Sequence, residues 1–145
     1  MRGGPLTLQQ CLTEERSIVF DADVLINFWN KKIERGLLDR IPRQQRFYTT
    51  ISGAEFLFNR APDEMKRRQD WLADQGMNRL HLSSNAEKTF WNLILHYPRA
   101  PGGIPDRLTA AITLVVPNSV LATGNIKDFR FIAGFHWVDD FASPS

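Results

Sequence analysis

Strand-like and helix-like segments alternate along most of this chain of 145 residues, and that alternation restricts the possible folds more than any other feature. Residues 17–20 (SIVF) are mostly apolar and β-branched, which is typical of a strand buried on both faces of a parallel sheet. Similar runs occupy residues 46–50, 78–82, 119–123 and 136–138, with helically spaced apolar residues in most of the intervals. We therefore predict an α/β fold of three layers, α/β/α, around a central, mostly parallel sheet of about five strands.

A single domain is sufficient to account for this pattern. A chain of this length, 43% hydrophobic, buries one sizeable core and is short for two domains. We expect that domain at residues 17–141, after an N-terminal extension at 1–16 and before a tail at 142–145. Within the extension, residues 6–15 favour a short helix, whereas the first five residues have the composition of a loose end.

The composition excludes several classes of protein. The single cysteine, Cys11, rules out an internal disulfide framework and a cysteine-based zinc site, and it suits a reducing compartment. The longest apolar stretch, residues 108–116, is far shorter than the ~20 residues of a membrane span, and the N-terminus has no apolar signal core. We expect a cytoplasmic protein without membrane contact.

Four carboxylates stand next to predicted strands, where the chemistry of α/β folds gathers. They are Asp21, Glu55, Asp106 and Asp128. The carboxyl ends of parallel strands share one edge of a sheet, so we expect these side chains to face one site near a switch in strand order. Each has apolar neighbours, and carboxylates so placed are desolvated and repel one another unless a cation joins them.

A divalent metal ion is the expected partner of this acidic cluster. Mg²⁺ and Mn²⁺ prefer oxygen ligands, which matches a cluster without histidine or cysteine. Such ions generate hydroxide, orient it in line with a phosphodiester and stabilise the leaving oxygen. Taken singly, each carboxylate also has a simpler interpretation as a helix cap, a first-turn charge or a solvated side chain.

At these residues the sequence resembles PIN domains, and in particular the VapC-type toxin ribonucleases of type II toxin–antitoxin systems. The similar segments are, in chain order, IVFDADVLINF, TTISGAEFLF, IPDRLTAAITL and VLATGNIKDF. The resemblance extends over residues 18–141 and implies a PIN-like (Rossmann-like) fold. It also implies a Mg²⁺- or Mn²⁺-dependent endoribonuclease that acts on an RNA substrate, is inhibited by a small cognate antitoxin protein and commonly forms a homodimer.

The resemblance also implies roles for individual residues. Asp21 and Asp106 would hold the main metal ion, and Glu55 would complete that site or relay to it. The fourth position stays open between Asp128 and Asn125, either of which would orient water or a second ion. The implied reaction is in-line attack of metal-activated water on an RNA phosphodiester, leaving 5′-phosphate and 3′-hydroxyl ends.

Thr123 lies in a segment that fits the family pattern, whereas positions 22 and 23 and the N-terminal extension depart from it. Thr123, just past its strand, is placed to hydrogen-bond Asp21, although a β-branched residue there also has a purely structural interpretation. Asp23 stands where the family usually has Asn or Ser, and Ala22 where it usually has Thr or Ser, so the site is more acidic. Family members also usually begin almost at the first strand.

Two other functions remain open from the sequence. The pair Asp21 and Asp23 matches the D-x-D opening of haloacid-dehalogenase-like phosphatases, in which Thr123, Lys127 and the Asp139–Asp140 pair would have to fill the other roles. Their spacing fits that superfamily poorly, because the lysine should precede the final acidic pair by a longer interval. The other possibility is a non-catalytic PIN-like domain that serves as a binding module.

Aromatic and basic side chains point to partners. Most of the large aromatics are expected in the core, and a subset is expected to line an antitoxin groove or a dimer face; they are Phe28, Trp29, Phe56, Phe58, Trp71 and Trp91. Two basic stretches, residues 31–46 and 66–68, are candidates for holding RNA phosphates. Without the acids at positions 21, 23, 55, 106 and 128, eleven acidic residues remain against eighteen basic ones, so the formal charge of +2 is consistent with a basic exterior around an acidic pocket.

Overall fold

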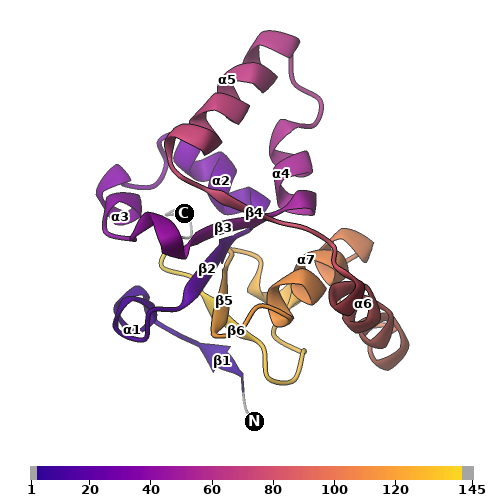
Figure 1. Ribbon diagram of the computed structural model, residues 1–145. Coiled ribbons are helices and arrows are strands. Elements are labelled where there is room, and N and C mark those ends of the chain that lie inside the picture. The colour runs from indigo at the N-terminus through magenta and orange to yellow at the C-terminus, as the bar shows by residue number, and fades with distance from the viewer. Residues whose placement is uncertain (1–2, 142–145) are drawn as a thin grey trace.

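The computed structural model describes residues 3–141, and in that part of the chain six strands form one sheet (Figure 1). The strands are β1 (Gly4–Pro5), β2 (Ser17–Phe20), β3 (Arg46–Thr49), β4 (Asn78–Leu80), β5 (Ser119–Ala122) and β6 (His136–Val138). Their order is β1-β6-β5-β2-β3-β4, and every neighbouring pair is parallel. The predicted α/β class and parallel sheet are confirmed.

Helices cover both faces of this sheet. They are α1 (Leu8–Thr13), α2 (Ala22–Trp29), α3 (Arg35–Asp39), α4 (Thr50–Leu57), α5 (Pro62–Asp74), α6 (Ser84–His96) and α7 (Ile104–Leu114), with short 3₁₀ turns η1 (Arg43–Gln45) and η2 (Ile126–Asp128). In Figure 1, α6 and α7 lie together on one side, whereas α1, α2 and α3 lie on the other. The three-layer arrangement is therefore as predicted. In residues 3–141 no helix is long and apolar enough to cross a membrane.

The alternation of side chains along the central strands divides the core in two. In β2, Ile18 and Phe20 pack into the cluster that includes α1 to α5, whereas Val19 packs into the cluster under α6 and α7. All three side chains are fully buried. Because successive residues of a strand point to opposite faces, a consecutive apolar run is required where both faces are covered.

The N-terminal extension is part of the sheet. Strand β1 pairs with β6, with Gly4 opposite His136, and α1 begins at Leu8, whose amide donates a hydrogen bond to Asp140. The prediction that the first five residues form a loose end is therefore wrong for residues 3–5. The sheet also has one strand more than the five or so predicted. A two-residue strand has no detectable pattern in the sequence. Pro5 has no backbone N–H to donate, so this strand is suited to the edge position that it occupies. Residues 142–145 lie outside the described part of the chain.

The strand order places a functional crevice at the carboxyl end of β2. From β2 the chain continues to β3 and β4 on one side, and then returns through β5 to the other side. Strand order thus reverses beside β2, and in open α/β sheets ligands bind at such switch points. Asp21 directly follows β2 and Thr123 directly follows β5, so both lie at this point.

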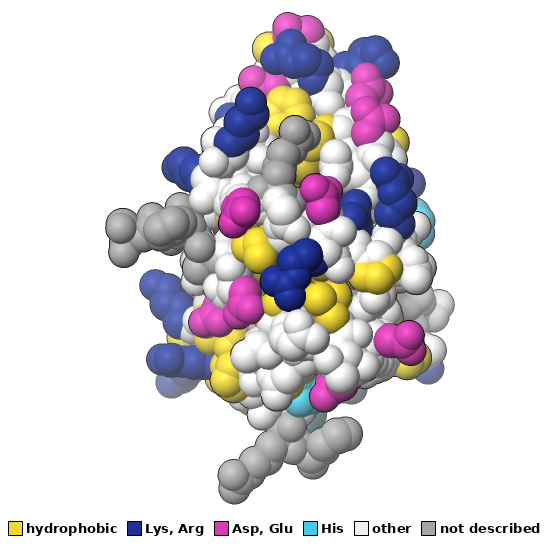
Figure 2. Space-filling model, turned by 90° about the vertical axis from the view of Figure 1, so that its left-hand side faces the viewer, with side chains coloured by type: hydrophobic (Ala, Val, Ile, Leu, Met, Phe, Trp, Pro, Cys, Tyr) yellow, Lys and Arg dark blue, Asp and Glu magenta, His cyan; other side chains and the backbone are white. Residues whose placement is uncertain are grey.

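One arginine of each basic stretch is used inside the fold, whereas Lys31, Lys32, Arg40, Arg43, Lys66 and Arg67 are exposed. Arg46 is buried, and its guanidinium donates to the carbonyl oxygens of Ile41, Leu38 and Gln75. Arg68 is also buried, with its guanidinium over the ring of Phe56. On the face shown in Figure 2, basic and acidic side chains alternate instead of forming one basic patch. The side chain of Arg35 lies outside what the structure describes.

Candidate active site

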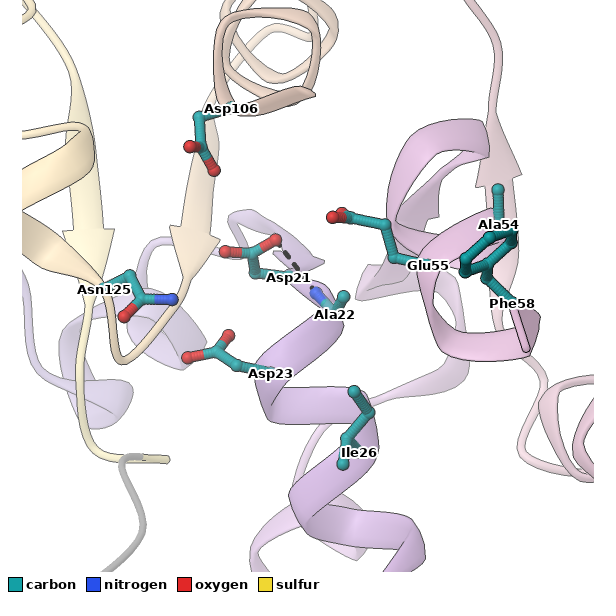
Figure 3. A pocket seen from close by; sticks show the side chains of 9 residues that line it. All are labelled: Asp21, Ala22, Asp23, Ile26, Ala54, Glu55, Phe58, Asp106 and Asn125. Carbon is teal, nitrogen blue, oxygen red and sulfur yellow. Dashed lines mark hydrogen bonds between the residues drawn. The ribbon is translucent and has the colours of Figure 1, made fainter. Parts of the chain in front are cut away.

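A cavity of about 520 Å³ opens at the carboxyl ends of β2 and β5. Its lining combines four carboxylates, one amide and four apolar side chains: Asp21, Asp23, Glu55, Asp106, Asn125, Ala22, Ile26, Ala54 and Phe58. Figure 3 shows Glu55 and Asp106 reaching toward Asp21 from opposite walls. Three of the four predicted catalytic carboxylates therefore meet at one cavity, although they come from segments far apart in the sequence.

Asp21 is the deepest of these carboxylates, and its orientation is fixed by hydrogen bonds. It is 7% exposed and is the N-cap residue of α2. Its Oδ1 accepts a hydrogen bond from the Ala22 amide at 2.9 Å, and its Oδ2 accepts one from the Thr123 hydroxyl at 2.9 Å. The hydrogen bond predicted for Thr123 is thus present, and Asp21 serves both as a helix cap and as a wall of the cavity.

Burial makes the ionised form of Asp21 unfavourable. Removal from water, reinforced by the nearby charge of Asp23, raises the pKa of the Asp21 carboxyl to about 7. The hydrogen bonds from Thr123 and Ala22 act in the opposite direction and are outweighed. A buried carboxyl with this pKa is a typical component of a functional site.

Asp23 is held against the turn after β5. Its Oδ2 accepts a hydrogen bond from the Gly124 amide at 2.8 Å, and its Oδ1 accepts one from the Val24 amide at 2.9 Å. Burial raises its pKa, while the Gly124 hydrogen bond opposes that rise. A Cβ added to Gly124 would lie 2.8 Å from the Asp23 carboxylate, so a glycine permits this close approach.

Glu55 enters the cavity from α4, which is capped by Thr49 through the Ser52 amide at 3.0 Å. Glu55 is exposed, and burial of part of its surface together with the charges of Asp106 and Asp23 raises its pKa. Ser52, which sequence reasoning missed, is buried with its hydroxyl 3.4 Å from Oδ1 of Asp21. A Thr at the end of a strand indicates the helix N-cap at Thr49, but no local pattern shows that the Ser52 hydroxyl lies near Asp21.

Asp106 lies in the first turn of α7, where its Oδ2 accepts a hydrogen bond from the Gly103 amide at 2.9 Å. The neighbouring Arg107 is buried and fixes the preceding loop. Its guanidinium donates to the carbonyl oxygens of Tyr97, Ala100 and Pro101 at 2.8–2.9 Å. Arg107 therefore positions the loop that holds Asp106, a role that sequence reasoning missed because the three carbonyls lie in a segment without regular structure.

Of the two residues left open for the fourth position, Asn125 is the one at the cavity. Asn125 lines the cavity, whereas Asp128 does not. Asp128 ends the 3₁₀ turn η2 and is half-buried. Its Cβ would lie 3.2 Å from a Cβ added to Gly102. Asp128 thus lies beside the loop that precedes Asp106, outside the cavity lining to which Asn125 belongs.

The oxygen atoms that line the cavity are of the type that binds a hard divalent cation, but they do not converge on a single point. Within residues 3–141, no group of three or more His, Cys, Asp or Glu side chains is close enough to hold a metal ion. The cavity nevertheless offers carboxylate and amide oxygens, which are the ligands Mg²⁺ and Mn²⁺ prefer. Since these carboxylates repel one another, we expect a bound cation to draw them closer.

Comparison with solved structures relates this fold to a known class. No model of a protein family and no curated protein matches the sequence. The chain resembles a toxin–antitoxin complex from Klebsiella pneumoniae (TM-score 0.66, 22% identity, 88% of this chain and 100% of that one). It also resembles VapBC2 from Rickettsia felis bound to a DNA fragment from its promoter (0.69, 15%, 83% and 96%) and VapBC-1 from nontypeable Haemophilus influenzae (0.66, 22%, 83% and 95%).

These likenesses define the class of fold. The described chain has a PIN-like α/β/α fold, with its acidic cavity at the edge where ligands bind in such sheets. More particularly, it is the fold found in the VapBC toxin–antitoxin complexes, and the resemblance predicted from the sequence is confirmed at that level.

Two of the residues required by the phosphatase alternative, Lys127 and Asp140, lie away from the cavity. Lys127 is exposed and does not line the cavity. Asp140 instead accepts a hydrogen bond from the amide of Leu8 at the start of α1. Asp21 and Asp23 therefore lack the lysine and the final acidic residue with which they would form a phosphatase site.

Proposed function

We propose that this protein is a metal-dependent endoribonuclease and the toxin of a toxin–antitoxin pair. The observation that carries the proposal is the convergence of Asp21, Glu55 and Asp106 on one cavity at the switch point of the sheet. The likeness to the VapBC complexes supports the toxin role, which would be exercised in the cytoplasm. An acidic cavity of this kind is unsuited to an RNA phosphate unless a cation is present, so metal dependence is part of the proposal.

Mg²⁺ or Mn²⁺ would be held between Asp21 and Asp106, with Glu55 completing the site. When bound, the ion supplies the positive charge that activates water and stabilises the leaving oxygen of the phosphodiester. Asp21 suits this role because Thr123 and Ala22 fix its rotamer. Asp106 suits it because the Gly103 amide occupies only one lone pair of its carboxylate.

The remaining residues of the cavity would orient the attacking water. Glu55 is the exposed carboxylate of the set, so it is accessible to a water attacking in line with the scissile bond and would accept its proton. Asn125 can donate a hydrogen bond through its amide to a water or to a phosphate oxygen. Cleavage would leave a 5′-phosphate and a 3′-hydroxyl.

RNA cleavage by the purified protein tests the proposal. We expect single-stranded RNA to be cut with Mg²⁺ or Mn²⁺ and to remain intact with EDTA. The substitutions Asp21→Asn, Asp106→Asn and Glu55→Gln should each reduce the rate by about 100-fold or more. The matched control is Asp70→Asn, which removes an exposed carboxylate paired with Lys66 on α5 and should leave the rate unchanged.

The same variants distinguish an enzyme from a binding module. Equal RNA cleavage by the wild-type protein and by the double variant Asp21→Asn with Asp106→Asn would refute the nuclease assignment. A protein that cuts no RNA under any metal condition, yet inhibits growth equally in both forms, would instead be a non-catalytic PIN-like binding module.

The proposed partners are a small antitoxin protein and a second copy of this chain. An apolar face suited to a partner is present on α6, where Trp91 is 55% and Leu95 is 72% exposed one helical turn apart. We expect a homodimer in solution by sedimentation analysis, and a monomer after Leu95→Glu. Co-expression with the product of a neighbouring small open reading frame, followed by size-exclusion chromatography, tests the antitoxin.

A further inference from the structure

An exposed aromatic ring stands at the rim of the acidic cavity. Phe58 is 77% exposed, the largest exposed fraction among the big apolar side chains that are solvent-exposed in residues 3–141. The others are Leu82, Trp91, Leu95 and Ile104, and none of them lines this cavity. Exposure of a phenylalanine beside four carboxylates is unfavourable in the free protein, which points to a ligand that covers the ring.

The ring is part of the apolar portion of the cavity lining. Phe58 stands with Ala54 at the end of α4, and Ile26 of α2 adds to the same lining. Figure 3 shows the ring on the Glu55 side of the cavity, with Asp106 and Asn125 across from it. The cavity lining therefore combines an exposed aromatic ring with carboxylates, Glu55 next to the ring and Asp106 across from it.

The backbone holds Phe58 in place without covering its side chain. Its amide donates a hydrogen bond to the carbonyl of Ala54 at 2.8 Å, which closes the last turn of α4. The next residue, Asn59, has a φ of 60°, a left-handed conformation that ends the helical path of the backbone directly after the ring. No aromatic pair among the described residues includes Phe58, and most of its side chain is open to solvent and accessible to a stacking partner.

We propose that Phe58 stacks on a nucleobase of the single-stranded RNA next to the bond that is cut. This inference rests on the nuclease function proposed above and adds how the substrate is held. A nucleotide combines a flat apolar base with an anionic phosphate, which matches an exposed aromatic ring beside carboxylates that would hold a cation. The cavity of about 520 Å³ is within the range of about 300–1,000 Å³ that is typical of small-ligand sites.

Stacking also determines which RNA is a substrate. A base within a duplex already stacks on its neighbours and is not free to cover the ring, whereas an unpaired base can be splayed onto it. Every base has a π-face, so the contact selects single strands over duplexes and selects weakly among base types. We therefore expect cleavage in loops and unpaired regions.

Three substitutions at position 58 distinguish stacking by the aromatic ring from the effect of side-chain size alone. Phe58→Ala removes the ring, Phe58→Leu keeps an apolar side chain of similar reach, and Phe58→Trp keeps a stacking surface. Because the ring is 77% exposed, all three variants should unfold at the same temperature as the wild-type protein. Steady-state cleavage of a short single-stranded RNA should show KM raised about 5-fold or more in the Ala and Leu variants but not in the Trp variant, with kcat changed less.

A spectroscopic readout tests stacking independently of cleavage. An RNA oligonucleotide that carries 2-aminopurine at the cleavage site should lose fluorescence when it binds the Asp106→Asn variant, because stacking quenches this base. Adding Phe58→Ala to that variant should remove most of the quenching, and adding Phe58→Trp should preserve it. An oligonucleotide with an abasic position there should bind the Asp106→Asn variant equally well with and without Phe58→Ala.

The outcomes distinguish this inference from the function on which it rests. If the wild-type protein cuts RNA and F58A has unchanged KM and quenching, the stacking role is refuted and the nuclease function stands. If no RNA is cut, the nuclease function is refuted. If, in addition, adding F58A does not diminish the quenching of 2-aminopurine fluorescence, the stacking role is refuted as well. Unchanged RNA binding combined with lost antitoxin binding in F58A would overturn the inference in favour of a protein partner at this ring.

Discussion

Replacing the buried carboxylate of the candidate active site should stabilise the metal-free protein. Asp21 is 7% exposed, and burial together with Asp23 raises its pKa to about 7. Since the usual pKa of this carboxyl is near 4, ionising Asp21 costs roughly 4 kcal/mol more in the folded chain than in the unfolded chain. This cost is the upper limit for the stability gained when the charge is removed. Asn has the same shape as Asp and keeps the acceptor for the Ala22 amide.

We therefore expect Asp21→Asn to raise the free energy of unfolding by about 1–3 kcal/mol at pH 8. The gain is smaller than the upper limit because the Thr123 hydroxyl must reorient toward an amide group. For a chain of this size the change corresponds to an increase of roughly 3–10 °C in the unfolding midpoint. Urea or thermal denaturation in the presence of EDTA measures it.

The stability difference between the two proteins should depend on pH. Between pH 4 and 7 the folded state keeps the Asp21 proton while the unfolded chain loses it, so Asp21 makes the wild-type protein less stable as the pH rises through this window. The advantage of Asp21→Asn should accordingly grow from pH 5 to pH 7 and stay constant above it. The control Asp70→Asn removes an exposed carboxylate and should change stability by less than about 0.5 kcal/mol at each pH.

Two results would refute this reasoning. One is an Asp21→Asn protein that is less stable than the wild type at pH 8, which would mean that the carboxylate contributes favourable interactions beyond those described. The other is a stability difference that does not vary between pH 5 and pH 8. Addition of Mg²⁺ should stabilise the wild-type protein and leave Asp21→Asn nearly unaffected, which links the cost of the buried charge to the proposed metal.

Three further predictions concern residues around the core and the site. Thr123→Val should destabilise by about 1–3 kcal/mol in urea denaturation, since it removes the hydrogen bonds to Asp21 and from the Asn125 amide, whereas Thr123→Ser should stay near the wild type. Arg107→Met should expose residues 97–103 to limited proteolysis and faster hydrogen exchange, because three carbonyls lose their donor; protection equal to the wild type would contradict this. Cys11 is fully buried and burial raises its pKa to about 11, so iodoacetamide at pH 8 should modify it at least about 100-fold more slowly in the native protein than in urea, as followed by mass spectrometry.

Most of the fold was predictable because its strands are buried on both faces. Runs such as residues 17–20 must then be apolar at consecutive positions, and that pattern is local and visible in the sequence. Strand β1 was not predictable, because its two residues gain their conformation only by pairing with β6. The buried roles of Arg46 and Arg68 were also hidden, since a basic run in the sequence does not show which guanidinium groups face their own backbone.

The sequence by itself determined which carboxylates this protein brings to strand ends, and therefore the oxygen-rich chemistry of its site. Asp21, Glu55 and Asp106 each follow from a local pattern of strand, cap or helix start. Only the tertiary structure shows that Asn125 lines the cavity whereas Asp128 does not, and only it shows Phe58 in the lining of the same cavity. The physical reason is that the direction of a side chain after a tight turn depends on packing against distant segments, such as the loop at Gly102, whose contacts no local pattern encodes.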